Sequence, residues 1–212
     1  MNILDELFTA IVDGNMDVAI DITKLAIDNN YDPKFIIENY MIKGMEEIGT
    51  RFQNGKAFVP ELLMAARAMK ASMELLTPLL VNENDITLGK IMIGTVKGDL
   101  HDIGKNLVAS MFEGCGFKVI NLGVDVDSKT FIQKFKEEKP DIIGMSALLT
   151  TTMSYMQEVI EEFVKEGLRD KVKFMIGGAP VSEGFAIKIG ADAYSNDANS
   201  AVVIAKQLLN IH

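Results

Sequence analysis

The sequence has no tryptophan, one cysteine and five prolines among its 212 residues. With Cys115 as its only cysteine, the chain can form neither an internal disulfide nor a metal site of several thiolates. Cys115 lies between Gly114 and Gly116, where we expect a small buried side chain rather than a nucleophile. Such sparse cysteine fits a reducing compartment.

Basic residues are too few to balance the acidic ones. The 21 lysines and arginines stand against 30 aspartates and glutamates, which leaves a net charge of −9. This charge argues against nucleic acid and anionic membrane surfaces as partners. No apolar run approaches the roughly 18 residues of a membrane span, and the first residues lack the basic region of a secretion signal. We therefore expect a cytoplasmic globular protein.

Residues 1–81 show apolar side chains at helical spacing. Asp32 and Pro33 have the pattern of an N-cap followed by proline at the first helical position. Gly55 interrupts the pattern, and Pro60 is expected to open the longest helix. These features predict an N-terminal bundle of four or five helices.

One turn of this bundle is unusually apolar, because Phe52, Phe58 and Val59 surround it. Apolar side chains at a turn are exposed unless something covers them. They either close the end of the bundle or form a lid over a ligand, and the segment alone leaves both interpretations open.

A polar stretch at about residues 82–89 separates the bundle from the rest of the chain. It predicts a helical domain at 1–88 and a second domain at 89–212. In the second domain, strands alternate with helices, which predicts an α/β fold with a flavodoxin-like or Rossmann-like five-stranded parallel sheet of order 2-1-3-4-5. The expected strands are Lys90–Val96, Lys118–Leu122, Ile142–Ser146, Lys173–Ile176 and Ala191–Tyr194. The expected helices are Asp102–Glu113, Asp127–Glu137, Thr152–Glu166, Val181–Ile189 and Asp197–Leu209.

The loop after the first strand carries His101, and the other histidine, His212, is the last residue. Asp99 lies two residues before His101 and Asp102 follows it directly. Ligands of open α/β sheets bind at such loops. His101 is therefore either a structural side chain or a metal ligand oriented by Asp99. One histidine cannot hold a free metal ion, but it can be an axial ligand of a metal already held in a macrocycle.

A phosphate-binding loop is a third interpretation of the same segment. Five residues separate Gly98 from Gly104, where the phosphate loop needs four, and Asn106 stands where it needs serine or threonine. The expected crevice holds no lysine or arginine except Lys97 and Lys105. The pattern therefore favours a large, mostly uncharged ligand over a multiply phosphorylated one.

Three motifs resemble those of cobalamin-binding domains of the methionine-synthase type. They are Asp99-x-His101-x-x-Gly104, Ser146-x-Leu148 and Gly177-Gly178. The longer match over Thr95–Asn106 makes the resemblance specific, and the segment from Phe52 to Pro60 resembles the helical cap of that family. The resemblance covers nearly the whole chain. Without a catalytic domain, it implies a stand-alone corrinoid protein of a methyltransferase system, with cobalamin as cofactor.

The resemblance also implies roles for individual residues. His101 would be the lower axial ligand of cobalt, Asp99 would accept a hydrogen bond from its ring, and Thr152 would complete this relay. Phe52, Val59 and Leu62 would cover the upper face. The other implied cofactor-binding residues are Gly98, Leu100, Asp102, Ile103, Gly104, Ser146, Leu148, Thr150, Gly177, Gly178 and Ala198.

The function implied by this resemblance is that of a corrinoid methyl carrier without catalysis of its own. It would accept a methyl group from a donor-specific methyltransferase and pass it to a second methyltransferase with a tetrahydrofolate, pterin or thiol acceptor. A reductive activator protein is a further expected partner. The alternatives are a cobalamin-dependent regulator or sensor, and a flavodoxin-like electron carrier. The acidic first domain disfavours the DNA-binding regulator, and the lack of tryptophan together with the placement of His101 disfavours a flavin carrier.

Overall fold

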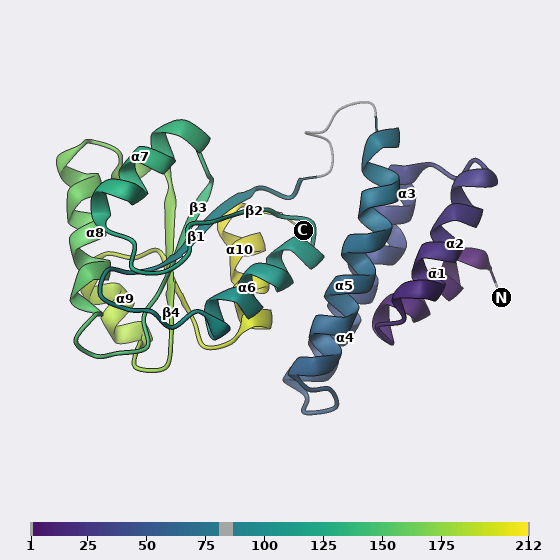
Figure 1. Ribbon diagram of the computed structural model, residues 1–212, viewed down its shortest axis with the longest axis horizontal. Helices are drawn as coiled ribbons and strands as arrows, with labels where there is room; N and C mark the ends of the chain where they lie inside the picture. Colours follow the sequence, from purple (N-terminus) through teal and green to yellow (C-terminus); the bar gives the residue numbers. More distant parts are fainter. Residues whose placement is uncertain (1, 81–86, 212) are drawn as a thin grey trace. The chain divides into compact units, whose positions relative to one another are not determined.

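The computed structural model describes residues 2–80 and 87–211 and divides into two compact units (Figure 1). The first unit comprises the chain up to residue 87 together with residues 113–116, and the second comprises residues 88–112 and 117–212. Most of the linker expected at 82–89 lies outside the described residues. No helix in the described part is long and apolar enough to cross a membrane.

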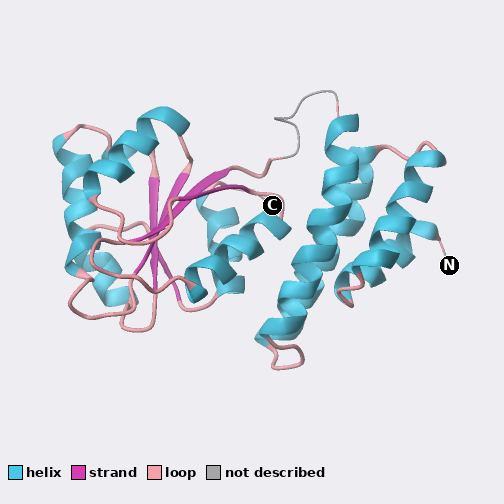
Figure 2. Ribbon diagram, viewed as in Figure 1, coloured by secondary structure: helices cyan, strands magenta, loops and turns pink. Residues whose placement is uncertain are grey.

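The first unit is the predicted helical bundle (Figure 2). Asn2 and Asn15 cap the first two helices by accepting hydrogen bonds from the backbone N–H groups of Leu4 and Val18. A π-helical turn joins the third helix to the fourth without a break. The helices are α1 (Ile3–Val12), α2 (Met16–Asp28), α3 (Pro33–Ile36), the π turn η1 (Ile37–Met41), α4 (Ile42–Gln53), α5 (Val59–Leu76) and the 3₁₀ turn η2 (Thr77–Leu79).

Helix α5 begins at Val59, one residue before the predicted Pro60. Phe58 is the N-cap residue, and its N–H donates to the Glu61 carboxylate at 2.6 Å. This bond stabilises the first turn. Pro60 is the second residue of the helix, where a backbone N–H has no partner within the helix, so the missing N–H of proline removes no hydrogen bond.

The second unit contains one parallel sheet with the predicted strand order, β2-β1-β3-β4-β5. The carboxyl ends of four neighbouring strands are in register, with Thr95 opposite Ser146, Ser146 opposite Gly177, and Gly177 opposite Ser195. The loops that leave these strands therefore start from one edge of the sheet. The strands are β1 (Lys90–Thr95), β2 (Lys118–Asn121), β3 (Ile142–Ser146), β4 (Lys173–Gly177) and β5 (Ala193–Ser195).

Five helices connect and cover these strands. Asp127, Ser182 and Asp197 precede helices as N-caps, because each side chain accepts a hydrogen bond from a backbone N–H three residues later. The expected helix starts at Asp127 and Asp197 are thus one residue early. The helices are α6 (Ile103–Gly114), α7 (Ser128–Glu138), α8 (Ser154–Lys165), α9 (Glu183–Ile189) and α10 (Ala198–Leu208).

Two other predicted boundaries are wrong for local reasons. Helix α8 begins at Ser154 rather than Thr152, whose side chain contacts Asp99 and whose N–H donates to the Leu149 carbonyl. Strand β5 begins at Ala193 rather than Ala191, because the N–H of Ala191 closes the end of α9 by donating to Ala186.

Aromatic rings pack α7 and α8 against the sheet. The ring centroid of Phe163 lies 5.1 Å from that of Phe174 and 5.3 Å from that of Phe135, both in edge-on geometry. Such pairs add to the stabilisation from burial. These three rings belong to the buried core that joins α7 and α8 to the sheet.

Candidate functional site

The site is organised around the carboxylate of Asp99, which follows β1 and is fully buried. Its Oδ1 atom accepts hydrogen bonds from the backbone N–H of His101 at 3.1 Å and from Nδ1 of His101 at 2.7 Å. Its Oδ2 atom accepts from the backbone N–H groups of Leu148 at 2.7 Å and Leu149 at 3.2 Å, and from the Thr152 hydroxyl at 2.8 Å. The structure therefore brings Asp99, His101 and Thr152 together.

These bonds keep Asp99 ionised. Burial by itself raises the pKa of a carboxyl group, but the donors Leu148, His101 and Thr152 favour the charged form and hold the pKa of Asp99 well below its usual range. The buried charge is thus compensated on both oxygens.

The ionised carboxylate sets the protonation of the imidazole. A carboxylate only accepts hydrogen bonds, so Nδ1 of His101 carries the proton and the lone pair of the neutral ring is on Nε2. The His101 side chain is 51% exposed. The arrangement presents a nitrogen lone pair at the surface, oriented from behind by a buried anion.

The loop after β2 holds the same segment from the other side. The N–H of Gly98 donates to Oδ1 of Asp125 at 2.7 Å, and the N–H of Asp125 donates to the Asp99 carbonyl at 3.0 Å. Sequence reasoning missed Asp125, which lies 27 residues from Gly98. The available signal was its place after the second strand, whose carboxyl end adjoins that of β1.

Lys105 is buried, although we expected it to be a cation in the crevice. Its ammonium group donates to the side-chain oxygens of Asn106 and Asn121. The amide of Asn106 in turn donates to Asp102 at 2.9 Å. Burial lowers the pKa of Lys105, and the charge of Asp102 partly opposes this effect. Lys105 therefore belongs to a network that holds the start of α6 against β2.

Large apolar side chains around His101 are exposed. Ile103 is 87% exposed and Leu100 is 71% exposed, while Leu148 and Leu149 are also exposed. Apolar groups gathered in this way indicate a surface that another molecule covers. A Cβ atom built on Gly104 would meet nothing within 4 Å, so the start of α6 leaves room beside them.

The two glycines after β4 are required by close packing. A Cβ atom on Gly178 would lie 1.9 Å from the Ala147 carbonyl oxygen, and φ of Gly178 is +127°. A Cβ atom on Gly177 would lie 3.1 Å from the Ser195 carbonyl oxygen. Both glycines therefore allow the end of β4 to pack directly against the neighbouring backbone at Ala147 and Ser195.

The remaining expected site residues lie at two places. In the second unit, Ser146 is partly buried at the end of β3, Thr150 is exposed in the following loop, and Ala198 is buried at the start of α10. In the first unit, Phe52 is partly buried, Val59 is exposed and Leu62 is fully buried. Phe58 was not among the expected contacts, yet it is the most exposed of these apolar side chains, at 68%.

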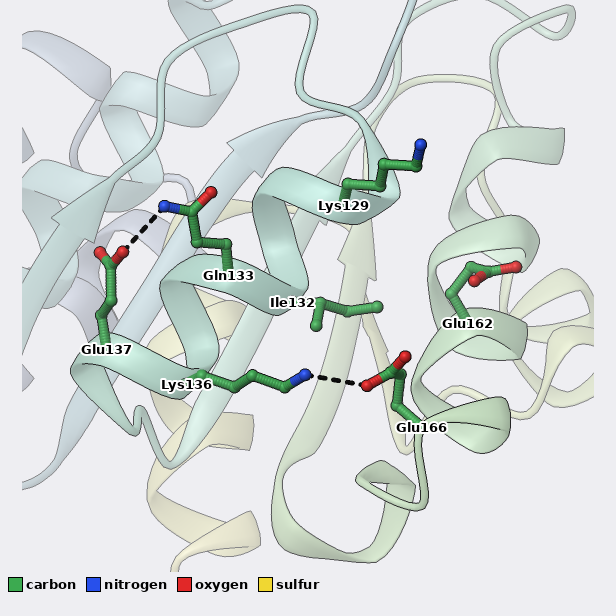
Figure 3. Close-up of a pocket in the computed structure, with 7 residues that line it drawn as sticks. All are labelled: Lys129, Ile132, Gln133, Lys136, Glu137, Glu162 and Glu166. Carbon is green, nitrogen blue, oxygen red and sulfur yellow. Dashed lines mark hydrogen bonds and ion pairs between the residues drawn. The ribbon is translucent and has the colours of Figure 1, made fainter.

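A groove between α7 and α8 lies apart from this edge (Figure 3). Two interactions cross or line it: Lys136 donates to Glu166 at 2.8 Å, and Gln133 donates to Glu137 at 2.9 Å. We assign no ligand to it. Its lining residues are Lys129, Ile132, Gln133, Lys136, Glu137, Glu162 and Glu166.

Comparison with known proteins gives one consistent result. Residues 89–203 match the family described as B12 binding domain, and residues 3–77 match a second family of the same description. A corrinoid protein of Desulfitobacterium hafniense is 41% identical over 99% of this chain and 98% of its own. The dimethylamine corrinoid protein of Methanosarcina barkeri is 45% identical over 98% of this chain and 97% of its own.

A solved structure shows the same architecture. The chain matches the methanol:cobalamin methyltransferase complex of Methanosarcina barkeri with a TM-score of 0.87 and 28% identity, over 98% of this chain and 80% of that one. The chain belongs to the corrinoid proteins with B12-binding domains.

The site of this corrinoid protein fits its cofactor. Among the described residues, no group of three or more histidine, cysteine, aspartate or glutamate side chains could hold a metal ion. A lone imidazole with its lone pair on Nε2 suits a metal whose other ligands come with a macrocycle. The exposed Leu100 and Ile103 suit the apolar parts of a corrin ring, and the open space at Gly104 leaves room beside them. The cofactor is a cobalamin-type corrinoid.

Proposed function

We propose that this corrinoid protein is a methyl carrier in which His101 is the lower axial ligand of the cofactor. When bound, the corrinoid supplies a cobalt centre that takes up a methyl group and releases it to an acceptor. The observation that carries the proposal is the hydrogen bond of 2.7 Å between Asp99 and Nδ1 of His101, which leaves Nε2 as the coordinating atom.

Asp99 and Thr152 orient and stabilise the histidine ligand. The buried carboxylate keeps the proton on Nδ1 and stabilises the ring whether Nε2 is coordinated or protonated. The Thr152 hydroxyl and the N–H groups of Leu148 and Leu149 hold Oδ2 of Asp99, so that Oδ1 stays directed at the ring. The pair can thus hold or lose one proton without leaving a bare buried charge.

The remaining contacts divide between two proposed domains. In the domain at 89–212, the loop from Gly98 to Gly104 would hold the lower face of the corrin ring. In the cap domain at 1–88, Phe52, Val59 and Leu62 are the residues proposed to shield the upper face from water. The residues proposed to hold the cofactor's displaced tail are Ser146, Leu148, Thr150, Gly177, Gly178 and Ala198.

Two methyltransferases are the proposed partners, one on the donor side and one on the acceptor side. The names of the relatives support this, because they are dimethylamine and trimethylamine corrinoid proteins and a methanol:cobalamin methyltransferase complex. Donor choice is assigned to the donor-side partner, because the site residues of this chain are those proposed to hold the cofactor. A reductive activator protein is a further proposed partner, which would return inactive cofactor to its active state by reduction.

Electron paramagnetic resonance of the cobalt(II) protein tests the ligand directly. With ¹⁵N-labelled histidine in the protein, the nitrogen splitting should change from three lines to two, because ¹⁵N has half the spin of ¹⁴N. His101→Ala should bind the corrinoid and lose the histidine-derived splitting. The matched control is His212→Ala, which removes the other histidine and should keep it. An unchanged three-line pattern in the labelled wild type would overturn the assignment.

The carrier role is tested by transfer. The loaded protein, incubated with a donor-side enzyme and its methylated substrate, should show the absorption change of methylation, and a second enzyme should reverse it. Demethylation of a small donor by this protein alone, at the rate of the coupled system, would show a catalytic site of its own and contradict the proposal.

A further inference from the structure

Gly98 and Asp125 form a reciprocal clamp around the peptide that precedes Asp99. The N–H of Gly98 donates to Oδ1 of Asp125, and the N–H of Asp125 donates to the Asp99 carbonyl. Both residues have left-handed backbone conformations, with φ of +77° at Gly98 and +55° at Asp125. An aspartate in this region is uncommon and has a conformational cost, which persists only where the surroundings require it.

We infer that Asp125 is a positioning residue for the Asp99–His101 pair. This inference rests on the proposed function, in which His101 is the axial ligand. The hydrogen bonds of Asp125 go to the Gly98 N–H and the Asp99 carbonyl, so it acts through the backbone that carries the pair.

The two ends of Asp99 are held by different segments. Its Oδ2 atom is held by the loop after β3, through Leu148, Leu149 and Thr152. Its backbone is held by Asp125 in the loop after β2. With both ends fixed, the direction of Oδ1 is fixed, and with it the direction of the His101 ring. Removal of the Asp125 carboxylate frees the N–H of Gly98 and loosens the turn that carries Asp99, while the backbone N–H of residue 125 can still donate to the Asp99 carbonyl.

Local folding does not explain the Asp125 carboxylate. The cap of α7 is Asp127, whose side chain accepts from the N–H of Thr130 at 2.8 Å. The neighbouring Val126 pairs with β1 through backbone, by donating to the Thr95 carbonyl. Within the described part of the chain, the carboxylate of Asp125 accepts one hydrogen bond, from the N–H of Gly98.

Three substitutions separate the carboxylate from the backbone conformation. Asp125→Gly keeps the left-handed conformation available and removes the acceptor for Gly98. Asp125→Asn keeps an acceptor oxygen and a residue that tolerates this conformation. Asp125→Ala removes the acceptor and introduces a residue that disfavours the left-handed conformation. Asp127→Ala is the matched control, because it removes a neighbouring carboxylate that also accepts from backbone and weakens the cap of α7.

The first measurement is the histidine-derived splitting of the cobalt(II) protein with ¹⁵N-histidine. In Asp125→Gly we expect the equilibrium constant for histidine ligation to fall about tenfold, as for the loss of one hydrogen bond to a charged group. Asp125→Asn should stay within about twofold of the wild type, since it retains the acceptor. Asp127→Ala should lower thermal stability and leave ligation unchanged. Wild-type ligation in Asp125→Gly, or equal loss in Asp127→Ala, would overturn the inference.

The second measurement uses the protein without cofactor. The Gly98 amide should exchange with solvent faster in Asp125→Gly than in the wild type, and the Nδ1 proton signal of His101 should broaden or shift. Both should be unchanged in Asp127→Ala. If the wild type showed no histidine-derived splitting, only the assignment of His101 as axial ligand would be refuted. The exchange of the Gly98 amide and the Nδ1 signal of His101 would still decide whether Asp125 positions the Asp99–His101 pair.

Discussion

Oδ2 of Asp99 lies 2.8 Å from the hydroxyl oxygen of Thr152, although 53 residues separate the two in sequence. The contact exists because β1 and β3 are neighbours in the sheet, so the loops that follow them leave from the same edge. It joins a buried anion to a second loop and makes the position of the histidine depend on both. The carboxylate is therefore a structural centre as well as a part of the proposed relay.

We predict that Asp99→Asn destabilises the protein without cofactor by about 3 kcal/mol. An asparagine can accept on one side only, and its NH₂ group would face N–H donors on the other, either at His101 or at Leu148 and Leu149. Urea unfolding followed by circular dichroism measures the change. Asp170→Asn, at an exposed aspartate, should change the free energy of unfolding by less than about 0.5 kcal/mol. Equal effects of the two substitutions would contradict the prediction.

Much of the second unit follows from sequence pattern. Alternating strands and helices predicted the sheet order, because a parallel sheet with right-handed crossovers allows few arrangements. The same topology places the loops of His101 and Thr152 at one edge of the sheet. Family resemblance then singled out which polar groups to pair.

The parts that were not predicted depend on backbone conformation. Asp125 accepts a hydrogen bond from Gly98 where both residues adopt positive φ, a conformation that no periodic pattern of the sequence reports. A lysine is usually a surface cation, yet Lys105 is buried and donates hydrogen bonds to two asparagine side chains. The π turn at Ile37–Met41 also lacks a signal, since the apolar spacing of one helix continues through it.

Gly178→Ala should destabilise the second unit by at least about 2–3 kcal/mol. The added methyl would lie 1.9 Å from the Ala147 carbonyl, at a φ of +127° that alanine avoids. The backbone after β3 or β4 must then move. Differential scanning calorimetry with and without corrinoid measures both the lost stability and the lost binding.

The control substitution, Gly184→Ala, should change stability in the opposite direction. Gly184 lies in the first turn of α9, is exposed, and has open space around a built Cβ atom. Gly184→Ala should therefore stabilise by up to about 1 kcal/mol through helix propensity. A neutral Gly178→Ala would show that the loop after β3 yields without cost.

Ser72→Ala should stabilise the helical unit by about 1 kcal/mol. The Ser72 hydroxyl in α5 is fully buried, and it has no hydrogen-bond partner within the part of the chain that the structure describes. Replacement by alanine removes an uncompensated polar group and leaves only a small void. Thermal unfolding measures the change. The contrast is Thr23→Val, which removes a buried hydroxyl that donates to the Ala19 carbonyl at 2.7 Å and should lower stability.

Lys105 should make stability depend on alkaline pH. Burial lowers the pKa of Lys105, with partial opposition from the charge of Asp102, whereas the unfolded chain keeps a lysine pKa of about 10.4. Between these two values the unfolded chain binds the extra proton, so the free energy of unfolding rises with pH, by at most about 1.4 kcal/mol per pH unit. Below the pKa of Lys105 in the folded protein, this residue makes no pH-dependent contribution to the free energy of unfolding. Above the pKa in the unfolded chain, the rise in the free energy of unfolding is complete.

The measurement is urea unfolding from pH 7 upward, expressed as the wild-type free energy of unfolding minus that of Lys105→Met. This difference should rise with pH, because methionine fills a similar volume without titrating. Lys118→Met is the matched control, since it removes an exposed lysine from the strand that supplies Asn121. Its difference should stay nearly flat over the same range. A difference for Lys105→Met that falls as pH rises would mean that the folded protein favours the charged amine, and that the asparagine oxygens outweigh the cost of burial.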